Sequence, residues 1–220
     1  MKKNLIILSL ALALGAHAAS YSANVIGFVK VNVGTNMTLV ADPFITGVTN
    51  GANEVLPTLA DGTGLLLWNP AIANFVSYTV YQGHYYNSTT GALVPTPVLG
   101  PGQGFFIKNF GAATNVTFAG SLAILPGKTN YISLPVGYTL VGSEVPTPGG
   151  IKSKLGLTLP STATLQFYTN GVYSQYTYSS GQWYNTKKSV VPEPVVFPGQ
   201  GFFFENLGTA AVIWPETLPH

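Results

Sequence analysis

Few residues of this chain have the chemistry that a catalytic centre needs. A glycosidase requires two carboxyl groups that face each other across a cleft, and the first half of the chain offers only Asp42, Glu54 and Asp61 as a group of acids. A nucleophilic triad would have to run through His84, and no Gly-x-Ser-x-Gly elbow is present. An enzyme would need two of these four side chains to meet in a pocket. We predict instead a non-catalytic protein.

No metal or cofactor site is predicted either. The chain has no cysteine, and its three histidines do not have the spacing of a zinc site. Residues 101–106 (Pro-Gly-Gln-Gly-Phe-Phe) have the glycines of a phosphate-binding loop, but they lack the Gly-Lys-Ser/Thr ending and a strand pattern follows them. We therefore interpret this segment as a Pro-Gly turn of type II that leads into a strand.

Tyrosine and tryptophan are the other residues that could bind a ligand. Their rings stack on sugars through apolar contact, and their polar tips form hydrogen bonds. Alternating aromatic residues also make good cross-strand pairs inside a sheet. We favour that structural role and keep a ligand platform as the alternative. The candidate platform residues fall at matching places in the two halves of the chain: Tyr78, Tyr85, Tyr86, Tyr176, Trp183 and Tyr184.

A repeated segment indicates how the chain is organised. The hexapeptide at residues 101–106 recurs unchanged at residues 198–203, 97 positions later. Because self-similarity at a fixed spacing is typical of repeated structural units, we predict an internal duplication. The predicted boundaries are a signal peptide at 1–18, β unit 1 at 19–120, a connector at 121–128 and β unit 2 at 129–220.

Short strand patterns dominate both units. Runs rich in β-branched and aromatic residues alternate with clusters of Gly, Pro and Asn, for example over residues 25–33, 75–81 and 105–108. We therefore predict an all-β fold of two tandem units of about 95 residues, each a β-sandwich or a barrel-like roll. One or two helical turns are expected near residues 53–59 and 151–155. Separate cores and one shared core both fit this pattern.

The N-terminus has the pattern of an export signal. Lys2 and Lys3 precede an apolar run at residues 5–14, and residues 16–18 (Ala-His-Ala) place small side chains where a signal peptidase needs them. The run is too short to remain as a membrane span. We predict an exported protein that resides in the periplasm, at the cell surface or outside the cell, without a transmembrane anchor.

Low charge is the most unusual property of the composition. Charged residues make up 7% of the chain, against about 25% in an ordinary soluble domain. Without the two lysines of the signal, seven lysines balance seven acidic residues, so the mature chain is formally neutral. A neutral surface without arginine is a poor partner for a phosphate backbone, and we do not expect nucleic acid to bind. The same neutrality favours association with other molecules.

The order of motifs resembles that of a family of uncharacterised, secreted bacterial β-repeat proteins. The motifs are Ser-Ala-Asn-Val-x-Gly-Phe-Val at residues 22–29, Thr-Leu-Val at 38–40, Leu-Trp-Asn at 67–69 and Pro-Gly-Gln-Gly-Phe-Phe-Ile at 101–107. In the second unit, residues 167–169 (Phe-Tyr-Thr) replace the Leu-Trp-Asn motif. The resemblance implies export and β architecture, and it implies no activity.

Two functions fit these observations. The first is an exported, non-catalytic structural or interaction protein that assembles with itself, as a homo-oligomer or filament, at the cell surface or in the extracellular matrix. The second is a carbohydrate-binding module that binds a polysaccharide through exposed tyrosine and tryptophan side chains. Open edge strands would carry self-association, and residues 24–33 are the candidate edge.

Overall fold

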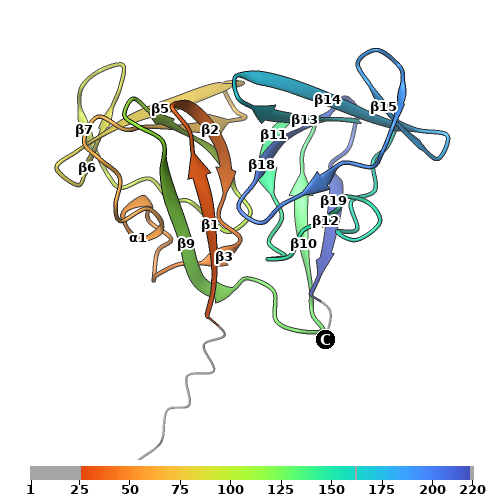
Figure 1. The fold of residues 1–220 in the computed structure, drawn as a ribbon, viewed down its shortest axis with the longest axis horizontal. Helices are drawn as coiled ribbons and strands as arrows, with labels where there is room; N and C mark the ends of the chain where they lie inside the picture. Colours follow the sequence, from red (N-terminus) through yellow and green to blue (C-terminus); the bar gives the residue numbers. More distant parts are fainter. Residues whose placement is uncertain (1–25, 162, 219–220) are drawn as a thin grey trace, which may run out of the picture.

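The computed structural model describes residues 26–161 and 163–218, and the predicted signal peptide lies outside these residues. Within them the chain is all-β, as predicted, and its strands form antiparallel sheets. Figure 1 shows two strand-rich units side by side, the first half of the chain in one and the second half in the other. No helix in the described part of the chain is long and apolar enough to cross a membrane.

Unit 1 consists of two sheets and one short helix, α1 (Ala52–Val55). In the three-stranded sheet, β1 (Ile26–Val33) and β3 (Phe44–Ile45) flank β9 (Thr114–Leu122). The other sheet has six strands in the order β2 (Asn36–Ala41), β8 (Gly104–Asn109), β4 (Gly64–Asn69), β5 (Asn74–Tyr81), β6 (His84–Asn87) and β7 (Leu93–Val94). Buried side chains from both sheets form one core.

Unit 2 is built in the same way. β10 (Thr129–Leu134) pairs with β19 (Val212–Thr217), and β12 (Gly149–Gly150) pairs with β17 (Val195–Val196). Its six-stranded sheet has the order β11 (Gly137–Gly142), β18 (Gly201–Asn206), β13 (Ala163–Thr169), β14 (Val172–Ser179), β15 (Gln182–Asn185) and β16 (Val190–Val191). A second core fills this unit.

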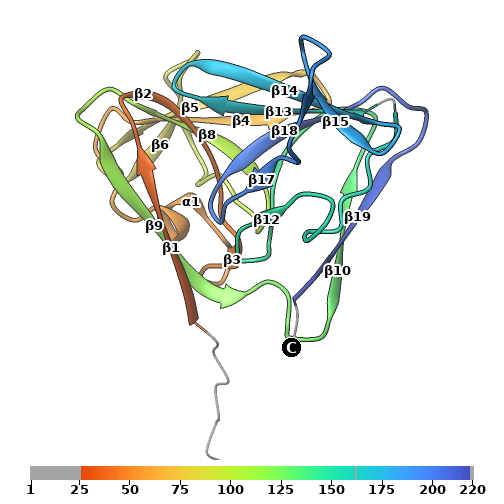
Figure 2. The ribbon, with the colours of Figure 1, turned by 45° about the vertical axis from the view of Figure 1, so that its right-hand side comes forward.

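The two six-stranded sheets have matching strand order and register. Val40 of β2 lies opposite Phe105 of β8, and Val141 of β11 lies opposite Phe202 of β18. Beside each sheet, a pair of strands, β1 with β9 and β10 with β19, covers the core (Figure 2). These shared pairings define equivalent positions in the two units.

The units meet through their six-stranded sheets. Val40 forms a β-bridge with Gln200, and the equivalent Val141 forms one with Gln103. A third buried cluster lies beside these bridges and combines side chains of both units. Each unit therefore contributes equivalent positions to the contact.

Aromatic rings fill this third cluster. Phe106 of unit 1 packs edge-on against Tyr168 of unit 2, with 5.1 Å between ring centroids. The equivalent pair, Phe203 and Trp68, is also edge-on, at 6.2 Å. Edge-to-face pairs at such distances contribute about 0.5–1.5 kcal/mol each beyond the area that they bury. Each unit thus has its own core, and a shared aromatic cluster joins the two.

The repeated hexapeptide forms the predicted turn. The N–H of Gln103 donates to the carbonyl of Gly100 at 3.0 Å, and Gly102 at the third turn position has a φ of 70°. In unit 2 the N–H of Gln200 donates to the carbonyl of Phe197, also at 3.0 Å. A type II turn requires a positive φ at that position, which glycine adopts without strain. The prediction of a Pro-Gly turn leading into a strand is confirmed.

The last glycine of the motif lets the two units approach closely. A Cβ atom at Gly104 would lie 2.8 Å from backbone atoms of Leu140 and Val141, and one at Gly201 would lie 2.8 Å from the carbonyl oxygen of Val40. Real side chains do not tolerate such distances to backbone atoms. The motif therefore serves the contact between the units.

The predicted helical turns are only partly correct. Near residues 53–59, α1 ends at Val55, because Leu56 precedes Pro57 and a residue before proline disfavours helical angles. Residues 151–155 form turns and no helix. There the N–H groups of Lys154 and Leu155 both donate to the carbonyl of Gly150, so a single turn forms and does not propagate.

Two predicted boundaries also shift. β9 runs to Leu122, two residues into the predicted connector, because Phe44 and Ile45 of β3 pair with its end. The candidate edge strand at residues 24–33 is described from Ile26 onward, and it belongs to the body of unit 1. Val33 is buried in the core, and β1 pairs with β9 along its whole length.

Candidate functional site

Most of the predicted aromatic platform is not available to a ligand. Tyr85 and Trp183 are only 3% and 5% exposed and belong to the two cores. The alternative of an exposed platform is wrong for both, and they have the packing role that we favoured, because strand alternation turns them inward. The other four are partly buried: Tyr78 and Tyr176 pack against the cores, while Tyr86 and Tyr184 alternate to the other face.

The candidate catalytic residues of unit 1 each stabilise a separate local structure. The carboxylate of Asp42 is fully buried and accepts a hydrogen bond from the Thr46 hydroxyl at 3.0 Å. Glu54 accepts backbone N–H groups before α1, and Asp61 accepts one from the turn between β5 and β6. His84 is exposed at the start of β6. None of the four lines the groove of about 770 Å³ that lies where the two units meet.

Sequence reasoning missed a pair of buried carboxyl groups in unit 2. Glu216 is fully buried and accepts hydrogen bonds from the Ser143 hydroxyl and from the N–H of Glu144, the latter at 2.8 Å. Glu144 is 7% exposed and accepts a hydrogen bond from the Asn130 amide at 2.6 Å. In the strand register Glu216 takes the place of Phe118. The signal that could have revealed this site is a glutamate in unit 2 at the position where unit 1 has a core phenylalanine.

Burial sets the protonation of these groups. It raises the pKa of Glu216 to about 7, against the hydrogen bonds from Ser143 and Glu144 that lower it. It likewise raises the pKa of Asp42 to about 6 and moves that of Glu144 upward. Loss of hydration disfavours the charged form of a carboxyl group. Since the three side chains are buried and hydrogen-bonded to neighbouring segments, we assign them a structural role.

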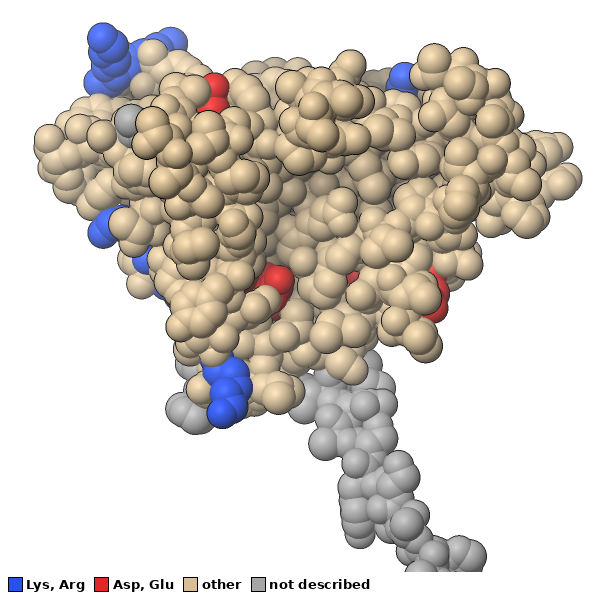
Figure 3. All heavy atoms as spheres, turned by 180° about the vertical axis from the view of Figure 1, so that it is seen from behind, with Lys and Arg blue, Asp and Glu red and all other residues tan. Residues whose placement is uncertain are grey.

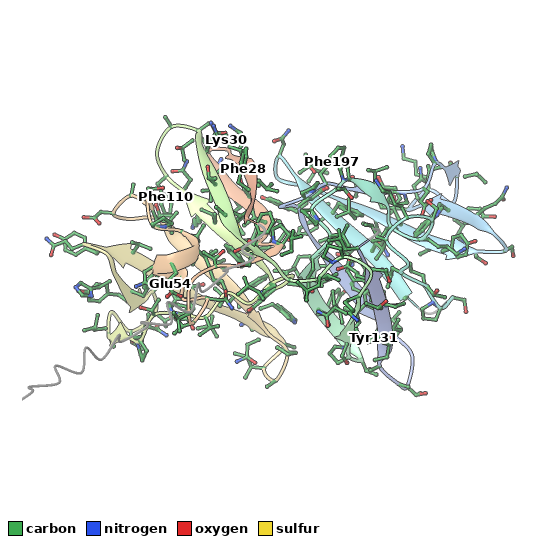
Figure 4. The ribbon with its side chains drawn as sticks, turned by 90° about the horizontal axis from the view of Figure 1, so that it is seen from below. Phe28, Lys30, Glu54, Phe110, Tyr131 and Phe197 are labelled. Atoms are coloured by element: carbon green, nitrogen blue, oxygen red, sulfur yellow. The ribbon has the colours of Figure 1, made fainter. Side chains whose placement is uncertain are left out.

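A groove of about 770 Å³ lies where the two units meet. One wall is the end of β1, the turn at residues 34–35 and β2 of unit 1. The other wall is the hairpin between β13 and β14 and the loop at residues 197–200 of unit 2. Figure 4 shows Lys30 of one unit and Phe197 of the other on the same side of the molecule. This volume is within the usual range of ligand sites, about 300–1,000 Å³.

The groove is polar but almost uncharged. Lys30 is the one ionised side chain of its lining, and neither an acid nor a histidine contributes. Such a lining supplies hydrogen bonds and apolar contact but no carboxyl or imidazole group for proton transfer. The amides and rings that carry its chemistry come from both units: Asn32, Asn36, Asn170, Gln200, Tyr168 and Phe197.

Comparison with known proteins adds no relative. The chain matches no protein-family model, no curated protein and no solved structure. The resemblance to secreted bacterial β-repeat proteins therefore stays a prediction, and so does export. Among the described residues, no group of three or more histidine or acidic side chains could hold a metal ion.

Proposed function

We propose that this is an exported, non-catalytic interaction protein that assembles with itself at the cell surface or in the extracellular matrix. The observation that carries the proposal is the open edge of β10. β10 pairs only with β19, and no described strand covers its other edge. An uncovered edge presents unpaired N–H and carbonyl groups to a neighbouring chain.

The sequence of β10 lacks the charges and the proline that usually prevent such pairing, and its one local block is the N–H of Tyr131, which donates to the Asn130 side chain at 3.0 Å. Its six residues, Thr-Asn-Tyr-Ile-Ser-Leu, contain neither a charge nor a proline. Natural proteins protect edges with lysine, proline or bulges. Four of the six side chains are exposed, including Asn130, which lies on the same face as buried Leu134. The strand is therefore accessible along most of its length.

The equivalent strand of unit 1 is protected. At the position of Tyr131 in β10, β1 has Lys30 in the middle of the strand. Tyr131 itself is 67% exposed and lies beside exposed Ile213 of β19, so a second copy would bury apolar area as well as edge hydrogen bonds. This difference points to β10, and not to the predicted β1, as the associating edge.

The rest of the surface supports the same reading. Charged side chains are sparse on the face in Figure 3, which leaves little electrostatic repulsion between copies. Large apolar side chains such as Phe28 and Phe110 are about three-quarters exposed, at 73% and 70%. The acids that could serve in catalysis are instead bound within loops.

Self-association is tested with Tyr131→Lys, which gives β10 the residue type of β1. The mass of the purified mature chain should rise with concentration in sedimentation equilibrium. The variant should lower the association constant by about tenfold or more, because like charges across a paired edge repel. Tyr81→Lys is the matched control, since Tyr81 is 52% exposed on β5, a strand paired on both sides.

Two results would contradict the proposal. One is a wild-type chain that stays monomeric up to its solubility limit. The other is a loss of association that is as large in Tyr81→Lys as in Tyr131→Lys, because association would then depend on general surface charge and not on β10.

A further inference from the structure

The contact between the units has two flanks, and the space on one of them is much larger than on the other. The groove of about 770 Å³ uses β2 of unit 1 and the β13–β14 hairpin of unit 2. The opposite flank uses β11 of unit 2 and the β4–β5 hairpin of unit 1, and its space is about 170 Å³. Since equivalent positions line both flanks, the residues that differ explain why one is larger.

Large rings close the smaller flank. The indole N–H of Trp68 donates to the carbonyl of Tyr138 at 2.8 Å, and the two rings meet edge-on with centroids 6.1 Å apart. Pro70 and Pro135 also line this space and leave it few hydrogen-bonding groups. The smaller flank is thus an ordinary packed contact.

Smaller and more polar residues line the larger flank. Tyr168 takes the place of Trp68, and Met37 takes the place of Tyr138. The hairpin tip is shortened to Asn170-Gly171, where unit 1 has four residues, 70–73. Tyr168 lines the groove, and its hydroxyl can both donate and accept a hydrogen bond, whereas the indole of Trp68 can only donate one.

An asparagine occupies a left-handed backbone position at the rim of the larger groove. Asn36 has a φ of 74°, and the equivalent residue of unit 2 is Gly137, with a φ of 91°. Glycine adopts such angles without strain, whereas other residues do so at a cost. Unit 1 therefore presents an exposed amide at a rim position where unit 2 has no side chain.

An exposed aromatic ring is added at the same place. The turn before β18 begins with Phe197, and the equivalent turn before β8 begins with Gly100. In both turns the first N–H donates to a glutamine side chain, Gln200 or Gln103, at 3.1 Å. Phe197 is 58% exposed, so its ring does not serve either core. The ring instead forms an apolar wall of the groove.

We propose that the larger groove binds a neutral oligosaccharide segment. Side-chain amides and hydroxyls at its rim match the hydroxyl groups of sugars, and the Phe197 ring offers an apolar face for stacking. One lysine without a second basic group does not favour a phosphate or a polyanion. This is carbohydrate binding at a site other than the predicted tyrosine platform, and it does not depend on self-association.

The test measures binding to soluble polysaccharides by affinity electrophoresis and calorimetry. The probes are a β-glucan, an α-glucan, a mannan, a xylan and, as the charged arm, polygalacturonate. Phe197→Ala should weaken binding about tenfold through loss of stacking. Asn36→Gly should weaken it about threefold through loss of hydrogen bonds, without loss of stability. Phe110→Ala removes a ring outside the groove that is more exposed than Phe197, at 70% against 58%, and should leave affinity unchanged.

The proposal is overturned if the wild-type chain binds none of the neutral probes, or binds only polygalacturonate. It is equally overturned if Phe197→Ala and Asn36→Gly bind as the wild type does, or if Phe110→Ala loses as much affinity as Phe197→Ala. All variants are repeated in the Tyr131→Lys background. Binding that persists there, with association abolished, separates the groove from the β10 edge.

Discussion

Replacing Glu216 by glutamine should change how stability depends on pH. Glu216 is fully buried, and its pKa is raised from 4.5 to about 7 in the folded chain. A raised pKa means that the folded state holds the proton more tightly than the unfolded state does. The free energy of unfolding therefore falls as pH rises from about 4 to about 7, and it is constant with respect to this group above that range.

The size of the effect follows from the same shift. One pKa unit corresponds to about 1.4 kcal/mol. The ionisation of Glu216 therefore lowers the free energy of unfolding by about 3 kcal/mol between acidic and alkaline conditions. Glutamine keeps the shape and does not ionise. Its carbonyl accepts from the N–H of Glu144, and its amide donates to the hydroxyl of Ser143. The free energy of unfolding of Glu216→Gln, taken relative to that of the wild type, should therefore rise by about 3 kcal/mol from pH 4 to pH 8.

Urea unfolding followed by circular dichroism at pH 4, 6 and 8 measures this difference. The contributions of titrating groups that do not interact with Glu216 cancel between the variant and the wild type, whereas Glu144, whose charge raises the pKa of Glu216, is part of the measured difference. Glu193→Gln is a control of opposite sign, since hydrogen bonds from Lys152 and Ser153 lower the pKa of Glu193. That variant should lose stability relative to the wild type as pH rises. The reasoning is refuted if the difference in free energy of unfolding between Glu216→Gln and the wild type is the same at pH 4 and at pH 8.

Three further changes test the packing between the units by thermal or urea unfolding. Gly104→Ala should cost about 1–3 kcal/mol, because its Cβ would press on the backbone of Leu140. Gly34→Ala, which meets nothing within 4 Å, should cost little, and equal costs would contradict the assignment. Trp68→Phe should lose about 1 kcal/mol with its hydrogen bond, and no loss would mean that the bond is unimportant. Thr139→Val should gain about 1 kcal/mol, because the buried hydroxyl lacks a partner in the described residues; a loss would show that it is satisfied.

Strand patterns and the Pro-Gly turn could be predicted because both are local. Period-two alternation and a glycine after proline fix backbone geometry within a few residues. The repeated hexapeptide gave the position of the turns at residues 100–103 and 197–200. Its role in joining the units depends on which backbone lies across from Gly104 and Gly201. That information is in the tertiary arrangement and not in the motif.

The groove could not be predicted for the same reason. Its two walls come from segments more than 100 positions apart, around Asn36 and Asn170. Aromatic content drew attention to Tyr85 and Trp183, whose rings the cores absorb. Aromatic content alone does not single out Phe197, whose exposure is known only from the structure. Comparing the two halves position by position would have shown Phe197 against Gly100 and Asn36 against Gly137.

The direction of β1 decides how a tethered molecule would face. β1 begins at Ile26 and ends at Val33, directly beside the groove, and eight extended residues span about 25 Å. The last described residue, Leu218, accepts a hydrogen bond from Gly127 at the end away from the six-stranded sheets (Figure 1). Attachment to a surface through either end of the described chain would place the six-stranded sheets, and the end of β1 that borders the groove, on the side away from that surface.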